Sequence, residues 1–115
     1  MQLAAVLFAL AALGGITMVG IRLSGRPRPP TWLAIGHGSI AAAGLFTLIY
    51  AAATSSLPTA AYVALGCFVL AAGGGAAIFA LFHMREKPLP IPFIAGHGAI
   101  AVTGFVLLLT ALLAS

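Results

Sequence analysis

The sequence predicts an all-α integral membrane protein, an up-down four-helix transmembrane bundle built from two parallel hairpin repeats. Three observations predict this fold. Of the 115 residues, 63% are hydrophobic and only 5% are charged, whereas about a quarter of the residues of a soluble domain are charged. The apolar residues form four runs, each long enough to cross a bilayer core about 30 Å thick as a helix. Finally, residues recur at a fixed offset of 60 positions.

The apolar runs and the prolines between them define the helices. The spans are expected at about 3–23, 32–53, 59–83 and 92–113, within a single transmembrane domain that covers residues 1–115. The three connections are short and contain prolines, which end one helix and suit the first turn of the next. Because the connections are short, consecutive helices are expected to pack side by side and antiparallel.

The charged residues predict how the chain is oriented in the membrane. All six lie in or beside the first and third connections, as Arg22, Arg26, Arg28, Arg85, Glu86 and Lys87. By the positive-inside rule the loops 24–31 and 84–91 are cytoplasmic and both termini lie on the opposite side. The start Met-Gln-Leu has no basic residue, so we expect a retained span rather than a cleavable signal peptide. The expected location is the bacterial inner membrane.

The composition excludes several classes of function. The single acid, Glu86, cannot provide a carboxylate pair, a carboxylate-rich metal site or a Ser-His-Asp triad within the membrane. The single Cys67 cannot provide a disulfide framework or a thiolate metal site. A basic patch needs a soluble surface, so the expected partner is the lipid bilayer and not a nucleic acid. Hydrolases of familiar type are therefore not expected.

The internal repeat divides the chain at about 1–55 and 56–115. The tripeptide Gly-His-Gly at 36–38 recurs at 96–98. Because the offset spans two helices, the two copies have the same orientation across the membrane. The histidines of the two tripeptides, His37 and His97, are therefore expected at equal depth on diagonal helices, about 7 to 8 Å inside their cytoplasmic ends.

An imidazole inside the hydrocarbon region needs a partner, because an unpaired polar group there costs several kcal/mol. Neither histidine-bearing span contains an acid that could pair with it. A metal with two open axial positions satisfies both histidines, and the iron of haem b has this property. We therefore expect His37 and His97 to be the axial ligands of one haem.

The glycines fit the same cofactor, because a wide, flat macrocycle needs bare backbone beside it. Those expected at the cofactor occupy equivalent positions in the two repeats: Gly14, Gly15, Gly36, Gly38 and Gly44, then Gly74, Gly75, Gly96, Gly98 and Gly104. Basic side chains of the cytoplasmic loops could bind the haem propionates through charge-assisted hydrogen bonds. The candidates are Arg22, Arg26, Arg28, Arg85 and Lys87.

This layout resembles the four-helix haem-binding core of membrane b-type cytochromes. In that family the second and fourth helices carry axial histidines, and the first and third carry glycines that face the haem. The resemblance implies an electron-transfer subunit of a larger respiratory or photosynthetic complex, with a quinone or another redox subunit as a candidate partner. The cytochromes of bc complexes carry two histidines on each of the two helices, whereas this chain carries one, so a second haem is not expected. The residues that match the family pattern are His37, His97, Gly14, Gly15, Gly74 and Gly75.

Alternatives stay open at this point. Each histidine could instead be a helix-packing residue bonded to a neighbouring Ser, Thr or backbone carbonyl, or could ligate the magnesium of a separate chlorophyll or bacteriochlorophyll. The chain could also be a cofactor-free accessory or assembly subunit, a self-associating protein or a small transporter, although proton-coupled transport usually needs a membrane carboxylate. The third histidine, His83, has Leu23 at its repeat position and is expected at the membrane interface with no ligand role.

Overall fold

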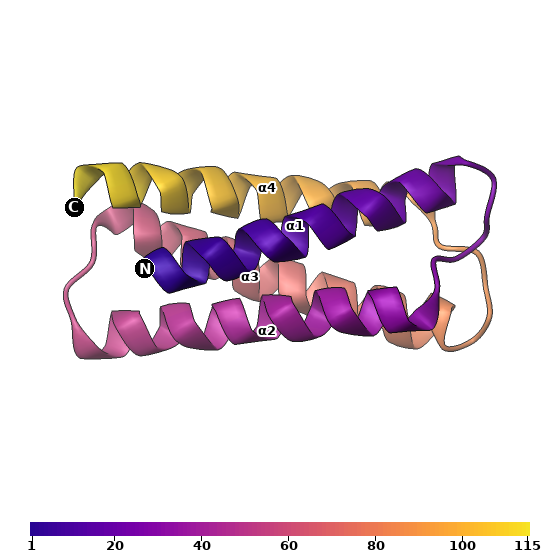
Figure 1. Cartoon of the computed structure of the whole chain (residues 1–115), viewed down its shortest axis with the longest axis horizontal. Coiled ribbons are helices and arrows are strands. Elements are labelled where there is room, and N and C mark those ends of the chain that lie inside the picture. Colours follow the sequence, from indigo (N-terminus) through magenta and orange to yellow (C-terminus); the bar gives the residue numbers. More distant parts are fainter.

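The computed structural model describes all 115 residues, and its only regular elements are helices. The helices are α1 (Gln2–Leu23), α2 (Thr31–Thr54), α3 (Thr59–Ile78), the short π-helix η1 (Phe79–His83) that continues α3, and α4 (Ile91–Ala114). They lie side by side along one axis, and the molecule measures 43 × 19 × 18 Å (Figure 1). Counting α3 and η1 together, four helices are long and apolar enough to cross a membrane. The structure thus confirms the four expected helices and is compatible with a four-helix bundle.

Prolines mark where three of the helices begin. Pro30, Pro58 and Pro90 directly precede α2, α3 and α4, and no side chain caps these helices. Each of these prolines has an extended ψ angle, between 122° and 150°, and proline has no N–H with which to continue a preceding helix. The observed ends therefore lie within one residue of those expected from the sequence.

The chain folds as two helical hairpins, which pack on each other near the termini and are joined again at the opposite end. Helix α1 packs mainly on α2, and α3 packs mainly on α4. Both termini and the connection between α2 and α3 lie at one end of the molecule, and the other two connections lie at the opposite end, which we call the loop end (Figure 1). Near the termini the hairpins touch through Phe8 and Phe68, whose rings stack with centroids 3.6 Å apart and planes 5° apart.

A small apolar core surrounds this ring stack. Leu48 of α2 and Leu108 of α4 are fully buried against it. A Cβ atom built on Gly44 would lie 3.2 Å from the Phe8 ring, and one on Gly104 would lie 3.0 Å from the Cβ of Cys67. Glycine at these two positions therefore lets the helices approach closely enough to bury the phenylalanines.

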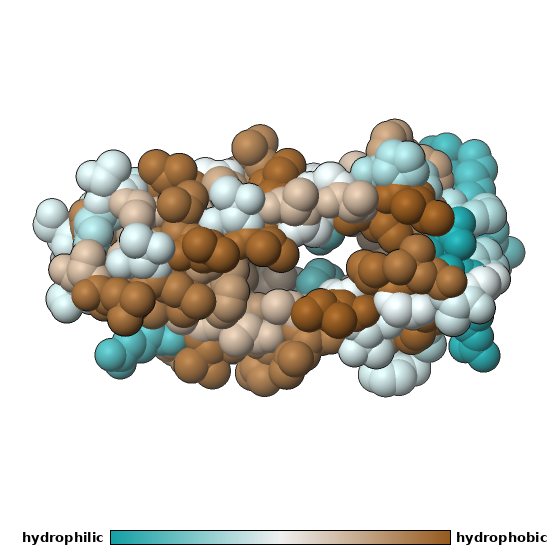
Figure 2. All heavy atoms as spheres, turned by 90° about the horizontal axis from the view of Figure 1, so that it is seen from above, coloured by the Kyte–Doolittle hydropathy of each residue, from teal (hydrophilic) through white to brown (hydrophobic).

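Closer to the loop end, the hairpins separate. Figure 2 shows an opening that passes between apolar side chains, nearer to the end where the hydrophilic residues gather. A cavity of about 230 Å³ lies on the α3–α4 hairpin, and its walls include Gly74, Phe82, Phe93 and His97. The gap in the packing is thus on the loop side of the aromatic core.

The two connections of the loop end are joined to each other. The backbone N–H of Leu89 donates a hydrogen bond to the carbonyl of Pro27, at 3.0 Å. The Nε–H of Arg22 donates to the carbonyl of Leu89, at 2.9 Å. These bonds close the end of the bundle that lies beyond the opening.

Candidate cofactor site

Two histidines from different hairpins lie side by side within the bundle. The ring centroids of His37 on α2 and His97 on α4 are 6.2 Å apart, and the ring planes are inclined by 77°. The Nδ1 atom of His37 lies 2.7 Å from the carbonyl oxygen of Ala11 on α1. The Nδ1 atom of His97 lies 2.8 Å from the carbonyl oxygen of Ala71 on α3. The two imidazoles therefore form equivalent hydrogen bonds, whose donor and acceptor residues are related by the same 60-residue offset.

These bonds determine which ring nitrogen carries the proton. A carbonyl oxygen can only accept, so Nδ1–H must be the donor in both bonds. In a neutral imidazole the lone pair then lies on Nε2, and the only hydrogen bond that each imidazole forms is the one through Nδ1. A metal-binding histidine commonly donates its other N–H to a carbonyl in this way, which orients the ring and increases the basicity of the ligand.

Glycines allow the imidazoles to reach these carbonyls. In an α-helix each carbonyl accepts a hydrogen bond from the N–H of the residue four positions later, so that residue lies next to the carbonyl. For the carbonyls of Ala11 and Ala71 these residues are Gly15 and Gly75. A Cβ atom on Gly15 would lie 3.2 Å from Cε1 of His37, and one on Gly75 would lie 2.9 Å from Cε1 of His97. A side chain at either position would therefore displace the ring.

The neighbouring glycines make looser contacts with the same rings. A Cβ atom on Gly14 would lie 3.6 Å from Cβ of His37, and one on Gly74 would lie 4.0 Å from Nδ1 of His97. The four glycines that resemble the family pattern therefore border the histidines in two equivalent pairs. The structure indicates that the bare backbone they provide accommodates the imidazoles.

The spacing of the rings suits one shared metal ion. A metal–imidazole bond is about 2 Å long and each nitrogen lies about 1 Å from its ring centre, so two imidazoles on opposite sides of one ion have centroids about 6 Å apart. The observed separation is 6.2 Å. With both Nε2 lone pairs free, the pair can provide two neutral nitrogen ligands.

The other glycines expected at the cofactor have different surroundings. Cβ atoms built on the four glycines that flank the histidines would meet no atom within 4 Å, at Gly36, Gly38, Gly96 and Gly98. Gly44 and Gly104 are buried against the aromatic core, so close helix packing alone explains why glycine occupies these two positions. Any contact of these six glycines with a cofactor stays a prediction.

The basic residues expected to bind propionates are dispersed over the loop end. Arg22 is held by the carbonyl of Leu89. Arg26 and Arg28 border a separate pocket between the two connections. Arg85 and Lys87 are exposed on the third connection. Propionate binding by any of the five stays a prediction.

One polar contact was not expected from the sequence. His83 is only 7% exposed, and its Nε2 atom lies 3.0 Å from Oγ1 of Thr31, the first residue of α2. The sequence predicts an interfacial side chain here because His83 ends an apolar run. The π-helix that turns this side chain inward has no clear local signal in the sequence.

In comparisons with known proteins, no family model, no curated protein and no solved structure matches this chain. The candidate site is therefore defined by the geometry of the chain's own residues, with His37 and His97 at its centre.

Proposed function

We propose that this chain is a membrane-spanning, b-type cytochrome-like electron-transfer subunit that holds one haem between His37 and His97. One observation carries the proposal: two repeat-related imidazoles, each fixed through Nδ1 by a helix carbonyl, lie with their ring centroids 6.2 Å apart and their Nε2 atoms unpaired. Bound haem would supply one-electron transfer between ferric and ferrous iron.

The surroundings of the pair support a flat, apolar cofactor. The hairpins separate between the aromatic core and the loop end (Figure 2), and the side chains lining the nearby cavity are mostly apolar. In this proposal His37 and His97 hold the iron, and the carbonyls of Ala11 and Ala71 keep both imidazoles in the orientation needed for binding.

The ring spacing favours one tetrapyrrole over two. One shared ion explains why the two rings lie only 6.2 Å apart, whereas two separate chlorophylls would not require the histidines to approach each other. A shared ion needs about 2 Å from each nitrogen, which this separation provides. The haem proposal therefore explains both histidines with one ligand.

The proposal also includes a membrane location and partners. The four apolar helices would cross the bacterial inner membrane, with the connections of the loop end on the cytoplasmic side because they hold the basic residues. The connections between the four helices are short and contain no further helix or strand that could bind an electron donor or acceptor. A larger membrane redox complex, or a quinone in the lipid phase, would therefore exchange electrons with the haem.

Absorption spectroscopy of the purified chain tests the proposal. We expect a reduced-minus-oxidised spectrum of low-spin haem b, with one haem per chain. His37→Ala and His97→Ala should each remove the bis-histidine signal, because each leaves the iron with one protein ligand. His83→Ala is the matched control and should keep it. Circular dichroism distinguishes a lost ligand from a lost fold.

Other outcomes would contradict the proposal. Extraction of a chlorophyll from the purified chain would assign the histidines to magnesium. A helical protein that binds neither haem nor chlorophyll after expression with an adequate haem supply would indicate a cofactor-free accessory subunit. Full retention of the bis-histidine signal in either histidine variant would assign the iron to other residues.

A further inference from the structure

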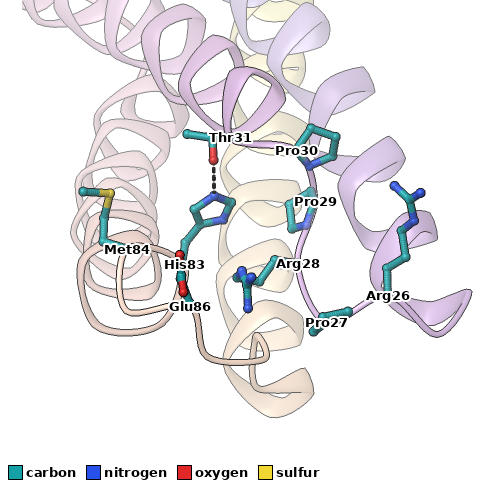
Figure 3. A pocket seen from close by; sticks show the side chains of 9 residues that line it. All are labelled: Arg26, Pro27, Arg28, Pro29, Pro30, Thr31, His83, Met84 and Glu86. Atoms are coloured by element: carbon teal, nitrogen blue, oxygen red, sulfur yellow. Dashed lines mark hydrogen bonds between the residues drawn. The ribbon is translucent and has the colours of Figure 1, made fainter.

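A polar pocket of about 390 Å³ lies at the loop end, apart from the histidine pair (Figure 3). Residues 26–30 of the first connection form one side, and His83, Met84 and Glu86 form the other. Thr31, at the start of α2, lies between the two sides in Figure 3. The pocket thus joins the two repeats at the end that carries nearly all the formal charge.

His83 is the buried polar group of this pocket. Its side chain is 7% exposed and stacks on Phe79, with ring centroids 5.1 Å apart. Nε2 is paired with Oγ1 of Thr31 at 3.0 Å, whereas Nδ1 forms no hydrogen bond and is not among the fully buried atoms. When the Thr31 hydroxyl donates to Nε2, the proton lies on Nδ1, which is then a free donor in the pocket wall.

The π-helix creates this arrangement, and it breaks the repeat. Residues 79–83 form a π-helix at the end of α3, whereas α1 remains α-helical to its end at Leu23. Leu23, the repeat equivalent of His83, is 63% exposed. Single-turn π-helices are frequent at functional sites, and here the wider turn accompanies a buried histidine.

Positive groups surround the same space. Arg26 and Arg28 border the pocket, and α2 begins at it after Pro30 with no side-chain cap. The first backbone N–H groups of a helix have no partner within the helix and favour anions. Glu86 is the one opposing charge in the pocket wall.

We propose that this pocket binds the phosphate group of a phospholipid headgroup, held by Arg28, His83 and the N-terminus of α2. Basic pockets at the cytoplasmic ends of transmembrane helices are suited to anionic headgroups. A lipid fits better than free phosphate because the pocket wall includes an apolar side chain, Met84, which is 63% exposed. The proposal rests on the proposed membrane location and is independent of haem.

Titration with soluble short-chain lipids tests this site. The full chain in a non-ionic detergent is titrated with dihexanoyl phosphatidylglycerol, dihexanoyl phosphatidylcholine or inorganic phosphate, and binding is followed by the backbone amide NMR signals of Thr31 and Met84 in the pocket wall. We expect saturable binding of phosphatidylglycerol. Arg28→Gln should weaken it about tenfold, as expected for one charge-assisted hydrogen bond, and Glu86→Gln should strengthen it several-fold.

Arg85→Gln is the matched control, because it removes the same charge from an exposed side chain outside the pocket. It should change the affinity less than twofold. An equal loss of phosphatidylglycerol affinity in Arg85→Gln and Arg28→Gln would indicate general electrostatic attraction and not a specific site. Inorganic phosphate that binds as tightly as phosphatidylglycerol would overturn the lipid assignment. Arg28→Gln that alters only the haem spectrum would assign Arg28 to a propionate instead.

His83→Gln keeps the proposal testable if Arg28→Gln does not fold. Glutamine retains a polar group near Thr31 but removes the second ring nitrogen, so the affinity for phosphatidylglycerol should fall while the helix content is unchanged. Unchanged affinity in a folded His83→Gln chain would contradict the role assigned to the buried histidine.

Discussion

Substitution of one glycine tests whether bare backbone positions the proposed ligand. In Gly75→Ala the new Cβ atom would lie 2.9 Å from Cε1 of His97, whereas ordinary contacts begin at 3.4 Å. The imidazole must therefore move by about 0.5 Å or leave its preferred rotamer, which costs about 0.5–1.5 kcal/mol. Movement also weakens the 2.8 Å bond from Nδ1 to Ala71, a contribution of about 1 kcal/mol.

A second effect of the same substitution acts in the opposite direction. Alanine stabilises a helix interior by about 1 kcal/mol relative to glycine. The free energy of unfolding of the apoprotein should therefore fall by only about 0.5–1.5 kcal/mol, the difference between these opposing effects. The haem affinity should fall about tenfold, because the ligand leaves its binding geometry and tenfold corresponds to about 1.4 kcal/mol.

The assay is haem titration of the detergent-purified apoprotein, followed by its Soret absorption, with thermal unfolding measured in parallel. Gly73→Ala is the control, because a Cβ atom there meets nothing within 4 Å, and it should bind haem as the parent chain does. Gly15→Ala, with a contact of 3.2 Å, should have an intermediate effect. If Gly75→Ala and Gly73→Ala bind haem equally well, the steric reasoning is refuted.

Three further predictions concern the rest of the molecule. Gly104→Ala places a Cβ atom 3.3 Å from the Phe68 ring and should lower the Tm without altering the haem spectrum; an unchanged Tm would show that the core adapts. Arg22→Gln loses the 2.9 Å bond to the third connection and should lower the free energy of unfolding by about 1 kcal/mol, measured by denaturant titration. In a chain whose native cysteine is replaced, cysteines introduced at Gly25 and Ser56 should react with a membrane-impermeant thiol reagent from opposite sides of the membrane; labelling from the same side would contradict the proposed topology.

The sequence predicts much of the fold because two of its signals are local. Apolar runs and the prolines before α2, α3 and α4 act on the residues beside them, so the helix ends could be placed to within one residue. The repeat then predicts that His37 and His97 are equivalent, and both donate to a carbonyl located 26 residues earlier. The identity of those carbonyls depends on how the neighbouring helices are aligned, which no local pattern specifies.

Other features depend on tertiary packing and could not be predicted from residue type. Gly44 and Gly15 are both glycines on apolar helices, yet Gly44 lies against a phenylalanine ring and Gly15 against an imidazole. The inward turn of His83 depends on a π-helix, and helical periodicity alone does not distinguish a π-turn from the end of an α-helix. Composition therefore predicts where small residues occur but not which neighbour each one accommodates.

The hydrogen bond from each imidazole stays within its own hairpin, and this has a consequence for the origin of the fold. His37 with the Ala11 carbonyl and Gly15 forms a complete half, and His97 with its counterparts forms the other. Neither half borrows an orienting group from its neighbour, so a single ancestral hairpin could have formed the whole arrangement as a symmetric homodimer. The second hairpin departs from this symmetry through the π-helix and His83.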